Sequence, residues 1–211
     1  MRGHPEVMDS DAVTVLEEPQ VYRGFFSLKK FLLHHRHFDG SRSKPLTREL
    51  LERGAATAIL LYDPQRDAVV LIEQFRVGAL RAAGGAWLIE VVAGVLGDEH
   101  DSEAVARRES LEEAGCRVGR IEKICDYLVS PGGTSEQITL YCGEVRSDDI
   151  GGLFGLDEEG EDIHAFVLPF ATAWAWLEQG EINSASPIIA LQWLKLHRPR
   201  LQQQWLYTQE P

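Results

Sequence analysis

The sequence predicts an α/β fold with a mixed sheet, preceded by a small N-terminal β unit. Apolar runs of strand length are interleaved with segments that carry helix start and stop signals. Strands and helices mixed in this way form two or three packed layers. Within the first 54 residues, residues 21–38 contain aromatic and basic side chains and are interpreted as strands. We therefore expect two parts, residues 1–54 and residues 55–211.

The N-terminal part is expected to contain strands only. Residues 1–18 are interpreted as a mobile lead. Residues 21–38 alternate partly between apolar and polar side chains and end at the Asp39-Gly40 turn, and residues 47–54 continue the unit. In the larger part, residues 56–62 and 69–75 flank an Asp63-Pro64 turn and predict a hairpin. Further strands are expected at residues 87–93, 121–129, 137–145 and 163–168.

Three helices are expected. Asp101 and Ser102 are good N-cap residues and Gly115 is a good helix terminator, which predicts a helix between them. Residues 170–179 form a second helix that stops at Gly180. A third helix begins near Pro187 and runs to about residue 197, because Pro199 ends or bends a helix.

The helix before Gly115 carries the most informative pattern in the chain. Glu109 lies three and four residues before Glu112 and Glu113, so the three carboxylates cover roughly 100° of one helix face. Such an arrangement is either a solvated acidic face or a binding site for a divalent cation, and hard oxygen ligands favour Mg²⁺ or Mn²⁺. A glycine-containing loop at residues 93–97, directly after an apolar strand, favours the site. Ala104, Leu111 and Ala114 are expected to face the core.

Composition narrows the class of function. Hydrophobic residues make up 44% of the chain and charged residues 26%, as in ordinary globular proteins, and the net charge is −12. This charge argues against a nucleic-acid partner or an anionic membrane surface. Three cysteines without a metal-binding spacing are expected to be small core residues in a reducing, cytoplasmic compartment. The start of the chain has no apolar run typical of a signal peptide, and no stretch approaches ~18 apolar residues.

The glycine loop and acidic helix together resemble the signature of the Nudix hydrolase family, G-x5-E-x7-R-E-U-x-E-E-x-G-U, where U is apolar. Gly94, Arg108, Glu109, Glu112, Glu113, Gly115 and Cys116 fit it. His100 stands at the first glutamate position and Ser110 at an apolar position. Glu99 or Asp101 are alternatives that could replace the missing carboxylate. Beyond this motif, segments such as YRGFFSL, VVLIEQFR, WLIEVVAG and SPGGTSE look like the bacterial ADP-ribose pyrophosphatase branch.

This resemblance implies a Nudix-type α/β/α sandwich that binds two or three Mg²⁺ ions, with Mn²⁺ as an alternative. The implied metal-binding positions are Ala93, Glu109, Glu112, Glu113 and Glu161. Arg108 is implied to orient the glutamates, and Glu112 is a catalytic position as well as a ligand. The acidic loop 156–162 is either a solvated loop or a segment that closes on substrate. In the second case Glu159 is the implied general base, with Glu158 and Glu161 as alternatives.

The resemblance also implies which residues hold the substrate. Arg76 ends a strand and could grip a phosphate through two parallel hydrogen bonds. Phe25 and Phe26 either pack as a buried pair or stack on a base. The turn at residues 130–134 is either a plain turn or a sugar-binding segment, and the N-terminal unit is implied to be swapped in a homodimer. The full implied set is Phe25, Phe26, Arg48, Glu49, Arg53, Arg76, Val95, Ser130, Pro131, Gly132 and Glu136.

The implied reaction is hydrolysis of the pyrophosphate bond of ADP-ribose, a small-molecule substrate, to AMP and ribose 5-phosphate. Two alternatives remain open at this point. One is hydrolysis of another nucleoside diphosphate sugar such as GDP-mannose, which the N-terminal unit would decide. The other is a non-catalytic nucleotide sensor, for which His100 is the motivation.

Overall fold

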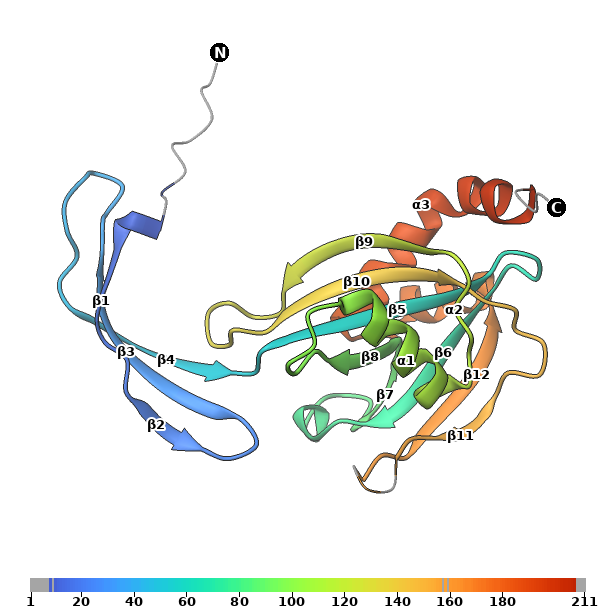
Figure 1. Cartoon of the computed structure of the whole chain (residues 1–211), viewed down its shortest axis with the longest axis horizontal. Coiled ribbons are helices and arrows are strands. Elements are labelled where there is room, and N and C mark those ends of the chain that lie inside the picture. Colours follow the sequence, from blue (N-terminus) through green and yellow to red (C-terminus); the bar gives the residue numbers. More distant parts are fainter. Residues whose placement is uncertain (1–7, 9, 157, 159, 208–211) are drawn as a thin grey trace, which may run out of the picture. The chain divides into compact units, whose positions relative to one another are not determined.

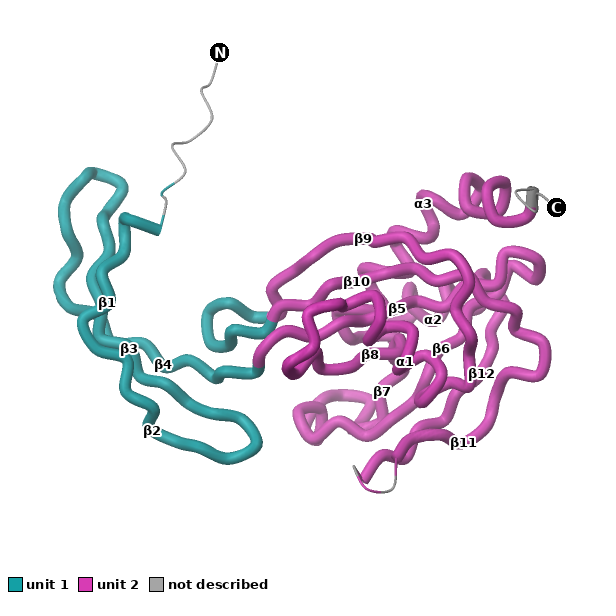
Figure 2. The backbone as a smooth tube through the Cα atoms, viewed as in Figure 1, with its two compact units in different colours: residues 1–53, 130–136 teal, residues 54–129, 137–211 magenta. Residues whose placement is uncertain are grey.

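The computed structural model describes residues 8, 10–156, 158 and 160–207. The chain divides into two compact units (Figure 1; Figure 2). Unit 1 comprises residues 1–53 and 130–136, and unit 2 comprises residues 54–129 and 137–211. None of the helices in the described part of the chain is long and apolar enough to cross a membrane.

Unit 1 is a four-stranded antiparallel sheet centred on β3 (Ser27–His35). β4 (Leu46–Glu52) pairs along most of β3, whereas β1 (Val13–Glu17) and β2 (Gln20–Arg23) pair with its two ends. A short 3-10 helix η1 (Ser10–Ala12) precedes β1. The prediction that residues 1–18 form a lead is therefore wrong for residues 13–17. These residues begin with Val-Thr-Val, a sequence that favours a strand. They pair with the C-terminal end of β3, which extends to His35.

A segment far away in the sequence completes unit 1. Residues 130–136 join β4, because the Leu51 N–H donates to the Gly133 carbonyl at 2.9 Å and the Ser135 N–H donates to the Leu51 carbonyl at 3.1 Å. The turn that contains Gly132 and Gly133 therefore lies against the strand that carries Arg48 and Glu49.

Unit 2 is built on an eight-stranded mixed sheet with the order β11-β12-β6-β5-β10-β9. β10 runs parallel to β5, and the other pairs are antiparallel. β11 was not expected from the sequence. The strands are β5 (Ala55–Asp63), β6 (Ala68–Phe75), β9 (Ile121–Leu128), β10 (Gln137–Glu144), β11 (Gly152–Phe154) and β12 (Ile163–Pro169).

The single strand predicted at residues 87–93 is two strands. β7 (Trp87–Glu90) pairs with β6, and β8 (Val92–Val95) pairs with β5. β5 and β6 pair with each other only from Leu61 to Asp63, next to their connecting turn. Farther from that turn, β6 pairs with β7 and β5 pairs with β8. The chain therefore changes its pairing partner from β6 to β5 at Val91. The 3-10 helix η2 (Val77–Ala79) lies between β6 and β7 in sequence.

Helices cover both faces of the unit 2 sheet, which confirms the α/β/α expectation (Figure 1). α1 (Ser102–Ala114) packs on the face formed by Ile59, Leu61, Val70 and Ile72. α2 (Phe170–Gln179) and α3 (Ala185–Tyr207) pack on the opposite face, where Leu60, Tyr62 and Leu71 point. Alternate residues of β5 and β6 thus serve two cores, as expected for strands that are buried on both faces.

α3 does not end near Pro199, as predicted, but continues to Tyr207. A proline removes one helical hydrogen bond and would be expected to end the helix. Here tertiary contacts hold the second half: Leu201 and Trp205 are buried in the core. Arg120 donates to the Gln204 carbonyl at 2.7 Å and also to that of Trp205. These contacts outweigh the local cost of the proline.

Candidate metal and phosphate site

α1 begins and ends as its sequence predicts. The Asp101 carboxylate accepts hydrogen bonds from the N–H groups of Glu103 at 3.0 Å and Ala104 at 3.1 Å. Gly115 ends the helix with a left-handed φ of 65°. Because both ends are fixed, the carboxylates at positions 109, 112 and 113 have a defined orientation.

The buried face of α1 differs from the predicted one. Ala104 is exposed and Leu111 is 47% exposed, whereas Val105, Ala106, Ser110 and Ala114 are buried. Ser110 can lie in the core because its hydroxyl donates to the Ala106 carbonyl at 2.6 Å. The prediction assumed that the carboxylates point away from the core. Instead the helix is rotated so that Glu113 faces the sheet.

Glu113 is a buried carboxyl group, with only 3% of its surface exposed. It accepts a hydrogen bond from the Ala93 N–H at 3.1 Å. Burial raises the pKa of Glu113 to about 8; the nearby carboxylates of Glu109 and Glu161 add to this rise, and the Ala93 N–H and the charge of Arg76 oppose it. A buried acid surrounded by other acids is costly unless a proton or a cation accompanies it.

Gly94 allows Glu109 to lie directly against β8. A Cβ at position 94 would collide with the carboxylate of Glu109, closer than any allowed contact. The glycine is therefore needed for the close approach of a side chain rather than for an unusual backbone angle. It brings the Glu109 carboxylate next to the strand that also holds Glu113.

Arg108 balances the exposed part of this acidic cluster. Its guanidinium lies 3.0 Å from Glu109, 2.9 Å from Glu112 and 3.4 Å from Glu99. Asp101 is engaged as the helix cap, so of the two alternatives for the missing carboxylate it is Glu99 that contacts Arg108. His100 is exposed. Arg108 thus contacts the glutamates, as the resemblance implies for an orienting residue.

The donor atoms of this cluster are of the kind that binds a hard divalent ion. Within the described ranges, no three His, Cys, Asp or Glu side chains are already arranged to hold a metal. The donors are nevertheless carboxylate oxygens, which suit Mg²⁺ or Mn²⁺. Gly94 allows Glu109 to lie against the strand, and burial raises the pKa of Glu113, with the neighbouring carboxylates of Glu109 and Glu161 adding to the rise. The residues fit a hard cation, with Arg108 as the present counter-charge.

The acidic loop before β12 is only partly described. Glu159, the implied general base, lies outside the described residues. Glu161 is described: its N–H donates to the Leu156 carbonyl at 3.2 Å, and its carboxylate accepts from the Leu156 N–H at 3.4 Å. The Glu161 carboxylate also contributes to the raised pKa of Glu113, which places the two acids within electrostatic range.

Arg76 lies after the end of β6 and is paired with a residue that sequence reasoning missed. Its Nε donates to Oε2 of Glu90 at 2.7 Å, and the buried Gln74 donates to the same oxygen at 3.4 Å. Glu90 is a charged residue within a strand that is otherwise apolar, and that pattern could have drawn attention to it. Val95, at the end of β8, is 51% exposed.

In unit 1 several predicted base- and sugar-binding residues contact one another. The Arg53 guanidinium lies over the Phe26 ring at 4.6 Å and 3.4 Å from the Glu136 carboxylate. Phe25 packs edge-on against Phe26 with ring centroids 4.8 Å apart, yet Phe25 is 93% exposed. A buried phenylalanine pair is therefore ruled out for Phe25.

The remaining predicted residues of unit 1 are solvent-accessible. Arg48 donates to its neighbouring carbonyl, that of Thr47, at 2.8 Å, and Glu49 is exposed on the same strand. Ser130 accepts backbone hydrogen bonds from Gly133 and Thr134 at 3.0 Å each, which closes the turn containing Pro131 and Gly132. The polar groups that the resemblance assigns to substrate thus lie on β4 and on the turn that joins it.

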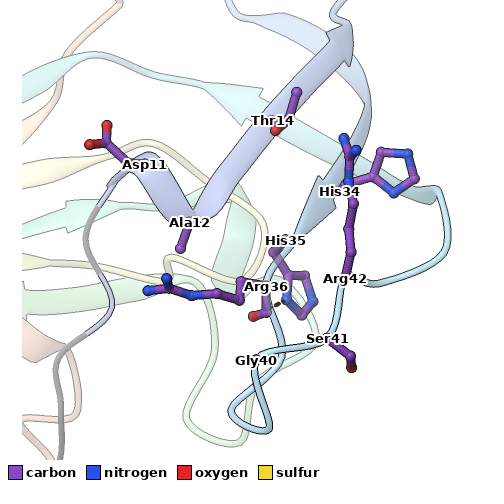
Figure 3. Close-up of a pocket in the computed structure, with 9 residues that line it drawn as sticks. All are labelled: Asp11, Ala12, Thr14, His34, His35, Arg36, Gly40, Ser41 and Arg42. Atoms are coloured by element: carbon purple, nitrogen blue, oxygen red, sulfur yellow. Dashed lines mark hydrogen bonds between the residues drawn. The ribbon is translucent and has the colours of Figure 1, made fainter.

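Two cavities have other residues in their walls. One, of about 230 Å³, lies in unit 1 among His34, His35, Arg36 and Arg42, and Figure 3 shows the two guanidinium groups extending in different directions. The other, of about 350 Å³, is lined by Glu73, Trp87, Leu153, Asp162 and His164 in unit 2. Glu73 and His164 face away from α1, because Ile72 and Ala165 beside them point toward it. Neither cavity is lined by a predicted site residue.

Comparison with known proteins identifies relatives along almost the whole chain. The family described as NUDIX domain matches residues 52–199. The ADP-ribose pyrophosphatase of Escherichia coli K12 is 43% identical over 201 residues, covering 95% of this chain and 96% of that protein. That of Haemophilus influenzae is 42% identical, covering 92% of this chain and 90% of that protein. The GDP-mannose pyrophosphatase of Citrobacter koseri is 34% identical, covering 88% and 96%.

A solved structure described as an ADP compounds hydrolase has the same fold. Its TM-score is 0.65 at 19% identity, and the match covers 90% of this chain and 98% of that one. The glycine loop, the acidic helix and the α/β/α layers agree with the family match over 148 consecutive residues of the sequence. The chain belongs to the Nudix family.

Proposed function

We propose that the protein hydrolyses the pyrophosphate bond of ADP-ribose and releases AMP and ribose 5-phosphate. The observation that carries this proposal is the 43% identity to an ADP-ribose pyrophosphatase over 95% of the chain. It is supported by an acidic helix in which Glu109, Glu112 and Glu113 are held at a glycine loop. The proposal covers both the bond that is cleaved and the base that is recognised.

The metal would be held by Glu109, Glu112, Glu113 and Glu161 together with the carbonyl of Ala93, with two or three Mg²⁺ ions, or Mn²⁺, per site. Bound divalent ions neutralise phosphate charge and make water a stronger acid. Arg108 would keep Glu109 and Glu112 oriented from the helix, since it already contacts both. Arg76 would grip a phosphate from the end of β6, and Val95 would border the substrate.

The general base is proposed to belong to the acidic loop 156–162. Glu159 would take a proton from the attacking water, with Glu158 or Glu161 as alternative bases. The water oxygen forms a bond to one phosphorus, the bond from that phosphorus to the bridging oxygen breaks, and the bridging oxygen leaves with the other phosphoryl group. The loop would act by closing on substrate. Glu161 belongs to this loop and lies two residues before the start of β12.

Unit 1 would supply recognition of the base and the distal sugar. The exposed Phe25 ring and the Phe26 ring beside Arg53 offer flat surfaces on which a base can stack. Arg48, Glu49, Ser130, Pro131, Gly132 and Glu136 would provide the polar contacts. We further propose a homodimer in which this unit is swapped between subunits. Light scattering should then give a mass twice the 23.6 kDa of one chain, and a monomer would contradict the swap.

The compartment is proposed to be the cytoplasm. Cys116, Cys125 and Cys142 are all free thiols, and burial raises the pKa of Cys116 to about 12, which makes it an unreactive core residue. Free cysteines of this kind are typical of proteins in a reducing environment.

A substrate panel tests the function directly. Purified protein is incubated with ADP-ribose or GDP-mannose in Mg²⁺, with EDTA as the control, and AMP, GMP and sugar phosphate are quantified. The expected result is metal-dependent release of equimolar AMP and ribose 5-phosphate. If ADP-ribose stays intact while GDP-mannose is hydrolysed, the GDP-mannose alternative, favoured by the Citrobacter koseri relative, replaces the proposal. Tight binding of ADP-ribose without any turnover would instead support a sensor.

A further inference from the structure

Three polar side chains form a hydrogen-bonded network along the paired strands β6 and β7. The Glu90 Oε2 atom accepts from Arg76 Nε at 2.7 Å and from Gln74 Nε2 at 3.4 Å. Gln74 is 6% exposed and the Glu90 side chain is 15% exposed, whereas the Arg76 side chain is 44% exposed. The network therefore runs from a buried amide, through a nearly buried carboxylate, to a guanidinium that reaches solvent.

The sheet register places this network on the α1 face of unit 2. Glu90 lies opposite Ile72 in the β6–β7 pair, and Ile72 packs in the core beneath α1. Gln74 is two residues further along β6, so its side chain points to the same face. Glu113 of α1 is buried against this face of the sheet, where it accepts from the Ala93 N–H at 3.1 Å.

The geometry of this pair differs from that of two other arginine–glutamate pairs in unit 2. Glu144 accepts from two nitrogens of Arg120, and Glu122 accepts from two nitrogens of Arg200. In both cases the carboxylate occupies two donors of the guanidinium. Glu90 engages only Nε of Arg76, and the two terminal nitrogens of Arg76 make no hydrogen bond within the described part of the chain.

We propose that Glu90 is a positioning residue, which holds Arg76 by its Nε so that the two terminal nitrogens are presented together to a substrate phosphate. Gln74 fixes the carboxylate in turn. The arrangement suits a diphosphate, because two parallel N–H groups match two phosphate oxygens. This inference rests on the proposed function of Arg76 as a phosphate ligand and assigns to Glu90 and Gln74 the task of orienting it.

The first test is a double-mutant cycle. Glu90→Ala should raise KM for ADP-ribose by about tenfold with little change in kcat, which lies within the range for loss of an orienting partner. Glu90→Gln keeps an acceptor oxygen and should raise KM less. In an Arg76→Ala background, Glu90→Ala should add no further increase, because Glu90 acts through Arg76. Glu122→Ala, which breaks an arginine pair away from the site, is the matched control and should leave KM unchanged.

Two outcomes would overturn the inference. Either KM is unchanged in Glu90→Ala, or it rises by the same factor with and without Arg76, which would show a role independent of the guanidinium. Thermal melting of each variant accompanies the kinetics, and Glu90→Gln decides the question should Glu90→Ala fail to fold.

A second measurement does not depend on the substrate. The Nε proton of Arg76, observed by ¹⁵N NMR, should exchange slowly with solvent in the unmodified protein and faster in Glu90→Ala. Equal exchange in both proteins would overturn the inference even if ADP-ribose is hydrolysed. Slow exchange that is lost in the variant would support the positioning network even if the substrate panel contradicts the proposed function.

Discussion

The two units of this protein obtain their structure in different ways. In unit 2, β5 is buried from Ala56 to Asp63 and both of its faces contact helices. In unit 1, by contrast, none of the apolar side chains in its described part is fully buried, and β1 and β2 are exposed along their whole length. Unit 2 has its own core, whereas unit 1 is one layer of sheet.

This difference explains how the proposed tasks are divided. Metal binding requires acidic side chains that are kept close together against their mutual repulsion, and only a packed core can do so; Glu113 in α1 is the example. Base recognition requires accessible aromatic and polar groups, and the exposed apolar side chains of unit 1, including Phe25 and Tyr22, provide them. A single-layer sheet with exposed apolar residues also needs a covering partner, which agrees with the proposed homodimer.

The largest expected effect concerns the packed unit. Glu113→Gln should lower kcat with ADP-ribose by about a thousandfold or more, because it removes a charged ligand for ions that contribute several kcal/mol to the reaction. The fold should persist, since glutamine keeps the shape and can still accept from the Ala93 N–H. Glu103→Gln on the same helix is the control and should retain activity, because Glu103 pairs with Arg107 outside the site. Unchanged turnover in Glu113→Gln would remove Glu113 from the metal site.

The second prediction addresses recognition by the single-layer unit. Phe25→Ala should raise KM for ADP-ribose by roughly 5- to 150-fold, as expected from a stacking contribution of about 1–3 kcal/mol. Phe38→Ala is a closely matched control: Phe25 and Phe38 are 93% and 95% exposed in the same unit. Steady-state kinetics of both variants would decide the matter. Equal effects would show that exposed apolar surface, rather than a specific base contact, is what matters.

The third prediction compares an aspartate turn in each unit. Asp63 is buried, and its Oδ2 accepts from the Ser147 N–H at 2.8 Å and the Ser147 hydroxyl at 2.7 Å, while Oδ1 accepts from the N–H groups of Gln65 and Arg66. Burial alone would raise the pKa of Asp63, but these hydrogen bonds hold it below 3.8. Asp63→Asn replaces one acceptor oxygen with a donor and should lower the free energy of unfolding at pH 7 by about 1–3 kcal/mol.

The sign of the pH dependence follows from the lowered pKa of Asp63. Its contribution is present above the unfolded value of 3.8 and is lost as the pH falls through the folded value, so the difference between the two proteins should shrink in acid. Asp39→Asn is the control in unit 1, because Asp39 accepts from Ser41 in an exposed turn. Urea unfolding at several pH values measures the free energy of unfolding of the unmodified protein and of both variants. A difference that is independent of pH would contradict the assignment.

Much of the fold could be predicted from local pattern. The caps at Asp101 and Gly115, the hairpin at Asp63 and the helix that ends at Gly180 are encoded by a few neighbouring residues, and the structure confirms them. The errors arose where distant contacts decide. The break at Val91 arises because β7 pairs with β6 whereas β8 pairs with β5. α3 continues past Pro199 because Arg120 and core contacts hold its C-terminal half.

The site was predictable only to the extent that its residues are adjacent in sequence. Spacing identified Glu109, Glu112 and Glu113, but it could not show that Glu113 rather than Leu111 faces the core. That orientation is set by the sheet beneath α1. Likewise Glu90 acquires its partner only when β7 pairs with β6. The sequence identified Arg76 as an arginine at the end of a strand, and only the tertiary structure shows that Glu90 is its partner.

The smallest expected effect tests the substitution that sets this chain apart from its signature. Glu99 contacts Arg108 at 3.4 Å, and both side chains are about half exposed, so the pair contributes at most about 1 kcal/mol. Glu99→Gln should therefore reduce kcat/KM no more than about fivefold, with Asp98→Asn as the neighbouring control. His100→Glu should leave kcat/KM similar or raise it, since a carboxylate there adds to the partners of Arg108. A severe loss in His100→Glu would show that the imidazole has its own role, and a severe loss in Glu99→Gln would show that this exposed pair governs the orientation of Arg108.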